Sequence, residues 1–114
     1  LGYKVAALTN NFRLDSAASC HVQPINLKLN EIFDVVVESC VVGLRKPDPK
    51  IYQVVCERLA VQPNEVVFLD DITANIRTAK SLGMSTVKVH LGKEKDAVDK
   101  LRFVVSKDCL PSKI

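Results

Sequence analysis

Short apolar runs alternate with helix-patterned segments along this chain, and no other feature limits its fold so narrowly. The apolar runs occupy positions 3–8, 33–37, 66–69 and 86–89. Strands separated by helices of this length are typical of βαβ units, whose sheets are mainly parallel. Uniformly apolar strands agree with this, because a parallel sheet is covered on both faces. The sequence therefore predicts an α/β fold with a doubly wound, Rossmann-like sheet.

Helix signals lie between and after these runs. Asp48-Pro49 combines a capping side chain with a proline for the first helical turn, and Gly83 is placed to end a second helix. Apolar residues recur at helical spacing in three segments: Ile51, Val54, Val55 and Leu59; Ile72, Ile76, Ala79 and Leu82; and Ala97, Val98, Leu101, Val104 and Val105. A short helix is also predicted over residues 25–32, and residues 12–23 are predicted as loop.

The length and the charge distribution narrow the protein class. The 114 residues are enough for one core, and we expect that core over residues 1–105 with a polar tail over 106–114. The 16 Lys and Arg and the 13 Asp and Glu residues are scattered rather than grouped into a stripe. Neither a nucleic acid nor a membrane is therefore predicted as a partner.

The four cysteines, Cys20, Cys40, Cys56 and Cys109, show neither a C-x-x-C pair nor zinc-ligand spacing. Cys56 falls on the helical pattern that begins at Asp48, where a reduced, packed thiol is the common outcome. Reduced cysteines favour an intracellular protein, so we expect a cytoplasmic location, with the peroxisome and the mitochondrion as alternatives. Disulfides in a secreted chain are the competing interpretation.

Polar residues at the ends of the predicted strands are the first candidates for a site, because ligands of open α/β sheets bind beyond the carboxyl ends of the strands. The residues in that position are Thr9, Asn10, Glu38, Ser39, Asp70, Asp71 and His90. Neither His90 nor His21 has a plausible ligand or nucleophile partner in the sequence. We interpret both histidines as ordinary surface or loop residues.

The adjacent pair Asp70-Asp71 is the strongest of these signals. Two neighbouring carboxylates repel each other, and a nearby cation relieves that repulsion. Mg²⁺ suits such a pair, since it prefers hard oxygen ligands and usually keeps several waters. The alternative is structural: Asp71 caps the helix that starts near Ile72, and Asp70 lies in a solvated turn.

Lys46 and the pair Thr9-Asn10 are weaker signals on their own. Prolines on either side of Asp48 stiffen the loop that follows Lys46, which can then act as a fixed point charge against phosphate. Thr9 and Asn10 offer a hydroxyl and an amide that can donate hydrogen bonds to an anion. A solvated lysine and a simple turn are the structural alternatives.

Taken in order, Thr9-Asn10, Lys46-Pro47 and Asp70-Asp71 resemble three motifs of the haloacid dehalogenase superfamily of hydrolases. Within it, the chain resembles the phosphatase-type amino-terminal domain of the bifunctional soluble epoxide hydrolases. The stretches ALTNNF, FDVVVESC, VGLRKPDPKIY and EVVFLDDITANI carry the resemblance, which covers nearly the whole chain up to about Val105. Receiver domains use similar residues but place the acidic pair first, so the order argues against them.

The resemblance implies a role for the phosphate-binding residues. Thr9 and Asn10 would hydrogen-bond the phosphoryl group that is transferred, and Lys46 would neutralise its charge as a binding and catalytic group. The implied reaction is hydrolysis of a small phosphorylated substrate, a phosphate monoester, through an aspartyl-phosphate.

The resemblance also implies the metal site. Asp71 would hold Mg²⁺ directly or through water, with Asp70 beside it as a second metal and catalytic residue. Asn75 would support these carboxylates. Mg²⁺ is thus the implied cofactor.

The nucleophile of the family is not among these residues. It belongs to a D-x-D motif at the end of the first strand, and no D-x-D sequence occurs in the chain; Asp15 and Asp34 both follow Thr9. The resemblance therefore implies a sheet of the haloacid dehalogenase type that lacks its first, central strand. We expect the chain to be inactive by itself and to be part of a longer parent, to which further domains can be fused.

Three functions stay open at this point. The first is part of a Mg²⁺-dependent phosphatase-like hydrolase. The second is a non-catalytic binding or regulatory module of a multidomain protein, which the missing nucleophile motivates. The third is a metal-independent haloacid dehalogenase, which the acidic pair at residues 70 and 71 disfavours.

Overall fold

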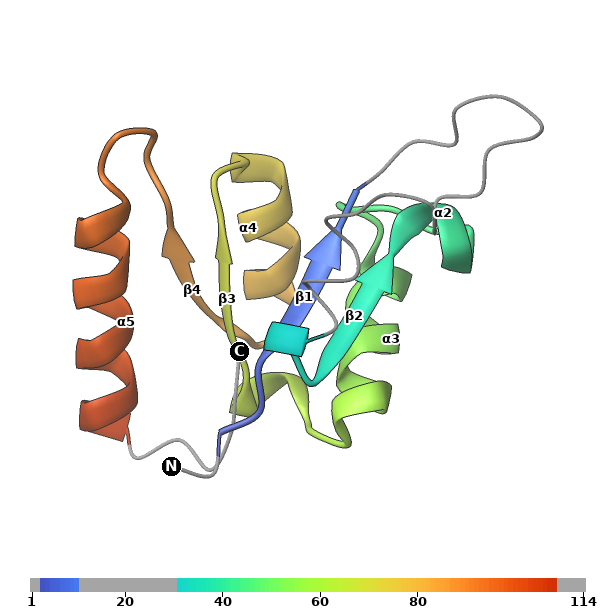
Figure 1. Cartoon of the computed structure of the whole chain (residues 1–114), viewed down its shortest axis with the longest axis horizontal. Coiled ribbons are helices and arrows are strands. Elements are labelled where there is room, and N and C mark those ends of the chain that lie inside the picture. The colour runs from blue at the N-terminus through green and yellow to red at the C-terminus, as the bar shows by residue number, and fades with distance from the viewer. Residues whose placement is uncertain (1–2, 11–30, 109–114) are drawn as a thin grey trace. The chain divides into compact units, whose positions relative to one another are not determined.

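The computed structural model describes residues 3–10 and 31–108, which divide into two compact units. The amino-terminal unit runs from Lys4 to Ala60, and the carboxyl-terminal unit contains Tyr3 and the residues from Val61 onward. Each unit is built on one pair of parallel strands that packs against helices (Figure 1). The predicted α/β class with parallel strands is therefore confirmed.

The amino-terminal unit is built on strands β1 (Ala6–Thr9) and β2 (Val35–Glu38). The strands run in parallel, and Thr9 and Glu38 form the last pair of the ladder. The short helix α2 (Ser39–Val42) follows β2 directly and ends at Gly43. The φ of 75° at Gly43 lies in the left-handed region, which glycine adopts at no steric cost.

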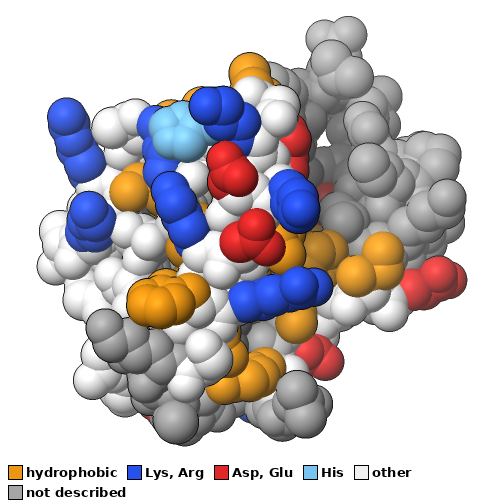
Figure 2. Space-filling model, turned by 90° about the vertical axis from the view of Figure 1, so that its left-hand side faces the viewer, with side chains coloured by type: hydrophobic (Ala, Val, Ile, Leu, Met, Phe, Trp, Pro, Cys, Tyr) orange, Lys and Arg blue, Asp and Glu red, His pale blue; other side chains and the backbone are white. Residues whose placement is uncertain are grey.

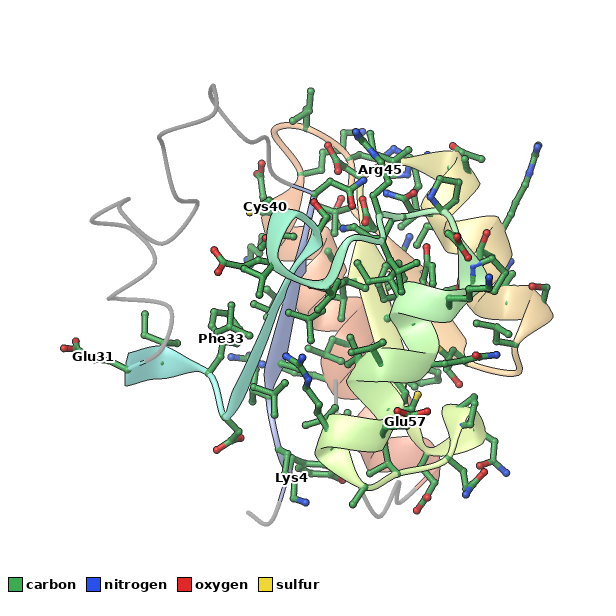
Figure 3. All side chains as sticks on the ribbon, turned by 90° about the vertical axis from the view of Figure 1, so that its right-hand side faces the viewer. Lys4, Glu31, Phe33, Cys40, Arg45 and Glu57 are labelled. Carbon is green, nitrogen blue, oxygen red and sulfur yellow. The ribbon has the colours of Figure 1, made fainter. Side chains whose placement is uncertain are left out.

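Helix α3 (Pro49–Leu59) packs against this strand pair and begins where its sequence signal predicts. The Asp48 carboxylate accepts a hydrogen bond from the Lys50 backbone N–H at 2.9 Å. At the other end of α3, the Lys4 ammonium donates to the Leu59 carbonyl at 2.9 Å (Figure 3). The residues that form the buried core here are Val37, Ile51, Tyr52, Val55, Cys56 and Leu59.

The described residues of the carboxyl-terminal unit form two strands and three helical segments. In chain order they are the 3₁₀ turn η2 (Pro63–Glu65), β3 (Val67–Asp70), α4 (Thr73–Ser81), β4 (Ser85–Lys88) and α5 (Glu94–Asp108). Strands β3 and β4 are parallel, with Asp70 opposite Lys88 in the last pair. Figure 1 shows α5 and α4 on opposite sides of this pair.

The two faces of β3–β4 bury different sets of side chains. Val67 of β3 and Val87 of β4 form a core with Ala97 of α5. The partly buried residues that pack against this core are Leu69, Val89, Leu101 and Val104. Helix α4 buries Asn75, Ile76 and Ala79. The outer face of α5 mixes acidic and basic side chains with isolated apolar ones (Figure 2). None of the helices formed by the described residues combines the length and the apolar composition that a membrane span requires.

The element boundaries differ from the predicted ones in a few places. Strand pairing continues through the polar residues Thr9, Glu38 and Asp70, because ladder hydrogen bonds are made by the backbone and not by the apolar side chains. The short segments α2 and η2 were not predicted, since neither is long enough to show a period. Helix α5 extends to Asp108, into the segment expected as a tail.

Some predictions fall on residues that the structure does not describe. The loop predicted over 12–23 lies wholly outside the described residues, as do most of the helix predicted over 25–32 and the tail beyond Asp108. Only Glu31 and Ile32 of that helix are described, and both are helical.

The expectation of fully reduced cysteines is wrong at one position. Cys40 in α2 is disulfide-bonded, whereas Cys56 in α3 is free and buried as predicted. Spacing along the chain does not reveal which cysteines approach each other, and this is why the disulfide was missed. A disulfide is more typical of an oxidising compartment than of the cytoplasm. Burial, with the nearby Glu57 as a smaller cause, raises the pKa of the Cys56 thiol above its ordinary value.

Candidate functional site

The carboxyl ends of β1 and β2 meet at one edge of the amino-terminal unit because the two strands are parallel. Thr9 ends β1, Glu38 ends β2, and Asn10 follows Thr9. Figure 3 shows Arg45, the residue before Lys46, at this end of the unit, while Lys4 lies at the opposite end. Polar residues from distant parts of the chain therefore gather at the carboxyl edge of this strand pair.

Asn10 and Lys46 are brought into direct contact at this edge. The Asn10 Oδ1 atom accepts a hydrogen bond from the Lys46 backbone N–H at 2.8 Å. The Asn10 Nδ2 atom donates to the Lys46 carbonyl at 3.0 Å. Both bonds are partly buried and join residues 36 positions apart. They place the Lys46 backbone beside the end of β1.

The hydroxyl of Thr9 is buried at the same strand end. Its Oγ1 atom has no hydrogen-bond partner in the described part of the chain. A buried hydroxyl without a partner costs about 1–3 kcal/mol, so such groups are rare in folded proteins. Thr9 thus holds an unused donor next to the residue that anchors Lys46.

Asp70, at the end of β3, is a buried carboxylate whose two oxygens are both engaged. Its Oδ1 atom accepts from the Ile72 backbone N–H at 2.9 Å. Its Oδ2 atom accepts from the Asn75 side-chain amide at 3.1 Å, and Asn75 is itself buried. These bonds fix the orientation of the Asp70 carboxylate.

Asp71 is the exposed member of the acidic pair. The structural alternative, in which Asp71 caps the following helix, is wrong: the N-cap residue of α4 is Ile72, and it makes no side-chain capping bond. Asp70 instead closes a turn over the Ile72 N–H, as aspartates commonly do two residues ahead of a backbone donor. The carboxylate of Asp71 is left at the surface beside a rigid turn.

Lys88 is a polar strand-end residue that the sequence analysis did not select. It pairs with Asp70 across the ladder, and its ammonium donates to the hydroxyl of Thr73, the first residue of α4. A charged residue inside an otherwise apolar strand was the available signal. It was passed over because residue 88 was expected to lie inside the strand and not at its end.

The donor set fits Mg²⁺ bound by few protein ligands. Within residues 3–10 and 31–108, no group of three or more His, Cys, Asp or Glu side chains could hold a metal ion. Mg²⁺ does not need such a cage, because it is usually bound by one or two carboxylates together with waters and phosphate oxygens. An exposed Asp71 next to an oriented Asp70 meets that requirement.

The predicted site residues fall into two groups. Thr9, Asn10 and Lys46 belong to the strand end of β1 in the amino-terminal unit, and Asp70, Asp71 and Asn75 belong to the strand end of β3 in the carboxyl-terminal unit. His90 is exposed, and His21 lies outside the described residues.

Comparison with known proteins places these residues in a family context. A family model described as haloacid dehalogenase-like hydrolase matches residues 1–83. The chain is 50% identical over 88 residues to mouse (Mus musculus) acyl-CoA dehydrogenase family member 10, covering 77% of this chain and 8% of that protein. It is 42% identical over 88 residues to pig (Sus scrofa) bifunctional epoxide hydrolase 2, covering 77% of this chain and 16% of that protein.

A smaller relative is matched over more of its length. A phosphatase of Mycobacterium tuberculosis is 38% identical over 101 residues, covering 85% of this chain and 44% of the phosphatase. The chain therefore spans less than half of the length of each of these curated relatives.

Solved structures agree with the fold. An uncharacterised protein of Corynebacterium glutamicum has a TM-score of 0.68 at 23% identity, covering 78% of this chain and 64% of its own. A HAD family enzyme of Bacteroides thetaiotaomicron, crystallised with magnesium and inorganic phosphate, has a TM-score of 0.54 at 31% identity, covering 57% of this chain and 33% of its own.

Proposed function

The chain belongs to the haloacid dehalogenase-like hydrolases, and on that premise we propose that it supplies the phosphate- and magnesium-binding part of a phosphate monoester hydrolase. The substrate class is a small phosphorylated molecule. Phosphoryl transfer asks a protein mainly for positioning and for charge stabilisation, and the two strand ends offer residues for both.

The observation that carries the proposal is the unpartnered hydroxyl of Thr9 beside the anchored backbone of Lys46. A phosphoryl oxygen would accept the hydrogen bond that Thr9 has available. The lysine, delivered to the same strand end, would place a positive charge against the anion. A core threonine with a purely structural role would instead bond a nearby carbonyl.

The acidic strand end would contribute the metal ligands. Asp71 would bind Mg²⁺ directly or through water, and Asp70, held by Asn75 and the Ile72 N–H, would keep the turn that presents Asp71 in one conformation. A bound Mg²⁺ neutralises developing charge on phosphate oxygens. Support comes from the related enzyme that was crystallised with magnesium and inorganic phosphate.

Turnover needs a group that these residues do not supply. Hydrolysis through an aspartyl-phosphate requires an attacking carboxylate, and the sequence has no D-x-D motif. Loss of a nucleophile commonly lowers the rate by several orders of magnitude. We therefore propose that these 114 residues bind phosphate but do not hydrolyse its esters, and that a parent protein with the motif does both.

Binding of inorganic phosphate to this chain is the direct test. We expect titration calorimetry with orthophosphate to show binding that Mg²⁺ strengthens. Asp71→Ala should remove the Mg²⁺ effect and Thr9→Val should weaken binding, whereas Asp99→Ala, an exposed acidic position on α5, should change neither. Equal phosphate binding by Asp71→Ala and the unmodified chain, with and without Mg²⁺, would refute the metal assignment.

Two assays separate the competing functions. A parent protein that carries an upstream D-x-D motif should hydrolyse p-nitrophenyl phosphate only with Mg²⁺ present. If the parent lacks the motif and no turnover is found, the non-catalytic module is the better description. Release of halide from a 2-haloacid without Mg²⁺ would favour dehalogenase chemistry instead.

A further inference from the structure

The side-chain amide of Asn10 makes two hydrogen bonds to a single residue, Lys46. Its carbonyl oxygen accepts from the Lys46 N–H at 2.8 Å, and its nitrogen donates to the Lys46 carbonyl at 3.0 Å. Each bond crosses from the end of β1 to the loop ahead of α3. The loop is therefore held to the strand by two bonds that meet at Lys46.

The chemistry of an asparagine side chain suits this double contact. Its amide carries a donor and an acceptor in one plane, so it can bond the N–H and the C=O of a single residue at the same time. Aspartate lacks the donor, and serine cannot offer the same planar pair.

The other side of the loop is fixed independently. The Asp48 N–H donates to the Arg45 carbonyl at 2.9 Å, and the Asp48 carboxylate caps α3 through the Lys50 N–H. Lys46 thus lies between the turn closed by Arg45 and Asp48 and the two hydrogen bonds from Asn10, which we call the clamp. The Lys46 backbone is therefore held from both sides.

From this geometry we propose that Asn10 is a positioning residue, whose side chain holds Lys46 in place for the phosphate rather than acting mainly as a donor to the phosphate itself. The proposal rests on the proposed function of Lys46 as the counter-charge. The acceptor of Asn10 and one of its two amide hydrogens are already engaged. Within the pair Thr9-Asn10, Thr9 therefore holds the hydroxyl for the anion and Asn10 fixes the cation.

Amide hydrogen exchange tests the clamp without any ligand. In the unmodified chain, the Lys46 N–H should be protected although it lies outside every helix and strand. In Asn10→Ala, its exchange should accelerate about tenfold or more, because an exposed amide replaces a hydrogen-bonded one. The Lys50 and Val37 amides should keep their rates.

Asp34→Ala is the matched control. Asp34 also bonds the backbone at an end of β1, since its carboxylate accepts from the Val5 N–H at 2.8 Å, but it does so at the opposite end of the strand. This variant should leave Lys46 exchange unchanged. If Asn10→Ala does not fold, the unmodified chain decides: exchange of its Lys46 N–H at the unprotected rate would overturn the clamp.

Orthophosphate affinity tests the consequence for Lys46. Asn10→Ala should weaken binding several-fold while the salt dependence stays as in the unmodified chain, because the lysine charge is still present. Lys46→Met should weaken binding and also flatten the salt dependence. Equal affinity of Asn10→Ala and the unmodified chain would overturn the positioning role. If the unmodified chain binds no orthophosphate, the proposed function fails, and the exchange data alone decide the clamp.

Discussion

The ends of β1 and β3 both place polar residues beyond a parallel strand, yet they treat those residues in opposite ways. At β3, the buried Asp70 is satisfied on both oxygens by neighbours within five positions of it in the chain. At β1, the buried hydroxyl of Thr9 has no partner among the described residues, and Asn10 bonds a residue 36 positions away. Local hydrogen bonds satisfy the buried side chain at the end of β3, whereas the end of β1 has a hydroxyl donor that no described residue uses.

The difference separates a carboxylate that the fold itself satisfies, Asp70, from a hydroxyl that still has a hydrogen bond to give, that of Thr9. A buried carboxylate must be satisfied or the unit loses several kcal/mol, so Asp70 cannot be spared for binding without cost. An unpaired buried hydroxyl costs less free energy than an unpaired buried carboxylate, and a ligand that accepts its hydrogen bond removes that cost. We make four predictions, from the largest expected effect to the smallest, and the first two test this contrast directly.

Asp70→Ala should destabilise the chain by about 3 kcal/mol, because it removes the acceptor of the bonds from the buried Asn75 amide and from the Ile72 N–H. Urea unfolding followed by circular dichroism measures this. Asp71→Ala, at the exposed neighbouring position, should stay within about 0.5 kcal/mol of the unmodified chain. Equal losses for both variants would remove the contrast between the two carboxylates.

Thr9→Val should stabilise the chain by about 1 kcal/mol while it weakens orthophosphate binding, because valine keeps the shape and removes a buried group without a partner. The same unfolding and calorimetry experiments report both effects. Thr78→Val is the control, since the Thr78 hydroxyl is exposed and bonds the Ala74 carbonyl. A clear loss of stability in Thr9→Val would mean that the hydroxyl is already satisfied.

Asp48→Ala should cost about 1 kcal/mol through loss of the α3 cap, and Asp48→Asn should cost little because asparagine caps equally well. Faster exchange of the Lys50 amide would accompany the loss. The two helices differ in this respect: α3 is capped by the side chain of its N-cap residue, whereas Ile72, the N-cap residue of α4, makes no such bond. An Asn variant as unstable as the Ala variant would contradict capping.

Cys56 should give the smallest effect, confined to alkaline pH. Its folded-state pKa is raised above the unfolded value, so the stability it contributes is complete below the unfolded pKa and is lost as pH rises through the folded one. We expect the free energy of unfolding to fall more steeply above about pH 9 than in Cys56→Ala. Parallel pH profiles for the two proteins would count against this assignment, as would rapid labelling of Cys56 by a thiol reagent at pH 8.

Much of the fold could be predicted from periodicity. The spacing of Ile51, Val54, Val55 and Leu59, with the cap at Asp48, predicted α3. All of these apolar residues except the half-buried Val54 are buried. Local signals of this kind suffice because a helix is made of near neighbours. The short helix α2 and the disulfide at Cys40 were missed, since one is too brief for a period and the other depends on distance in space.

The candidate site could be predicted as a set of residues but not as a network. The acidic pair, Thr9 and Lys46 were selected because they follow apolar strands or stand before prolines. The bonds from Asn10 to Lys46 could not be foreseen, since no pattern links residues in two irregular segments. Nor could the sequence tell which of Asp70 and Asp71 is buried, because this depends on where β3 ends: Asp70 is its last paired residue and Asp71 follows it.

The contact between Asn10 and Lys46 also bears on how such a chain can change over evolutionary time. Because two bonds tie the Lys46 backbone to the end of β1, its position there does not rest only on the polypeptide that precedes β2. In general, lengthening a loop costs little, about 0.6 kcal/mol for each doubling of its length. We therefore expect insertions and deletions ahead of β2 to leave the Lys46 backbone in place.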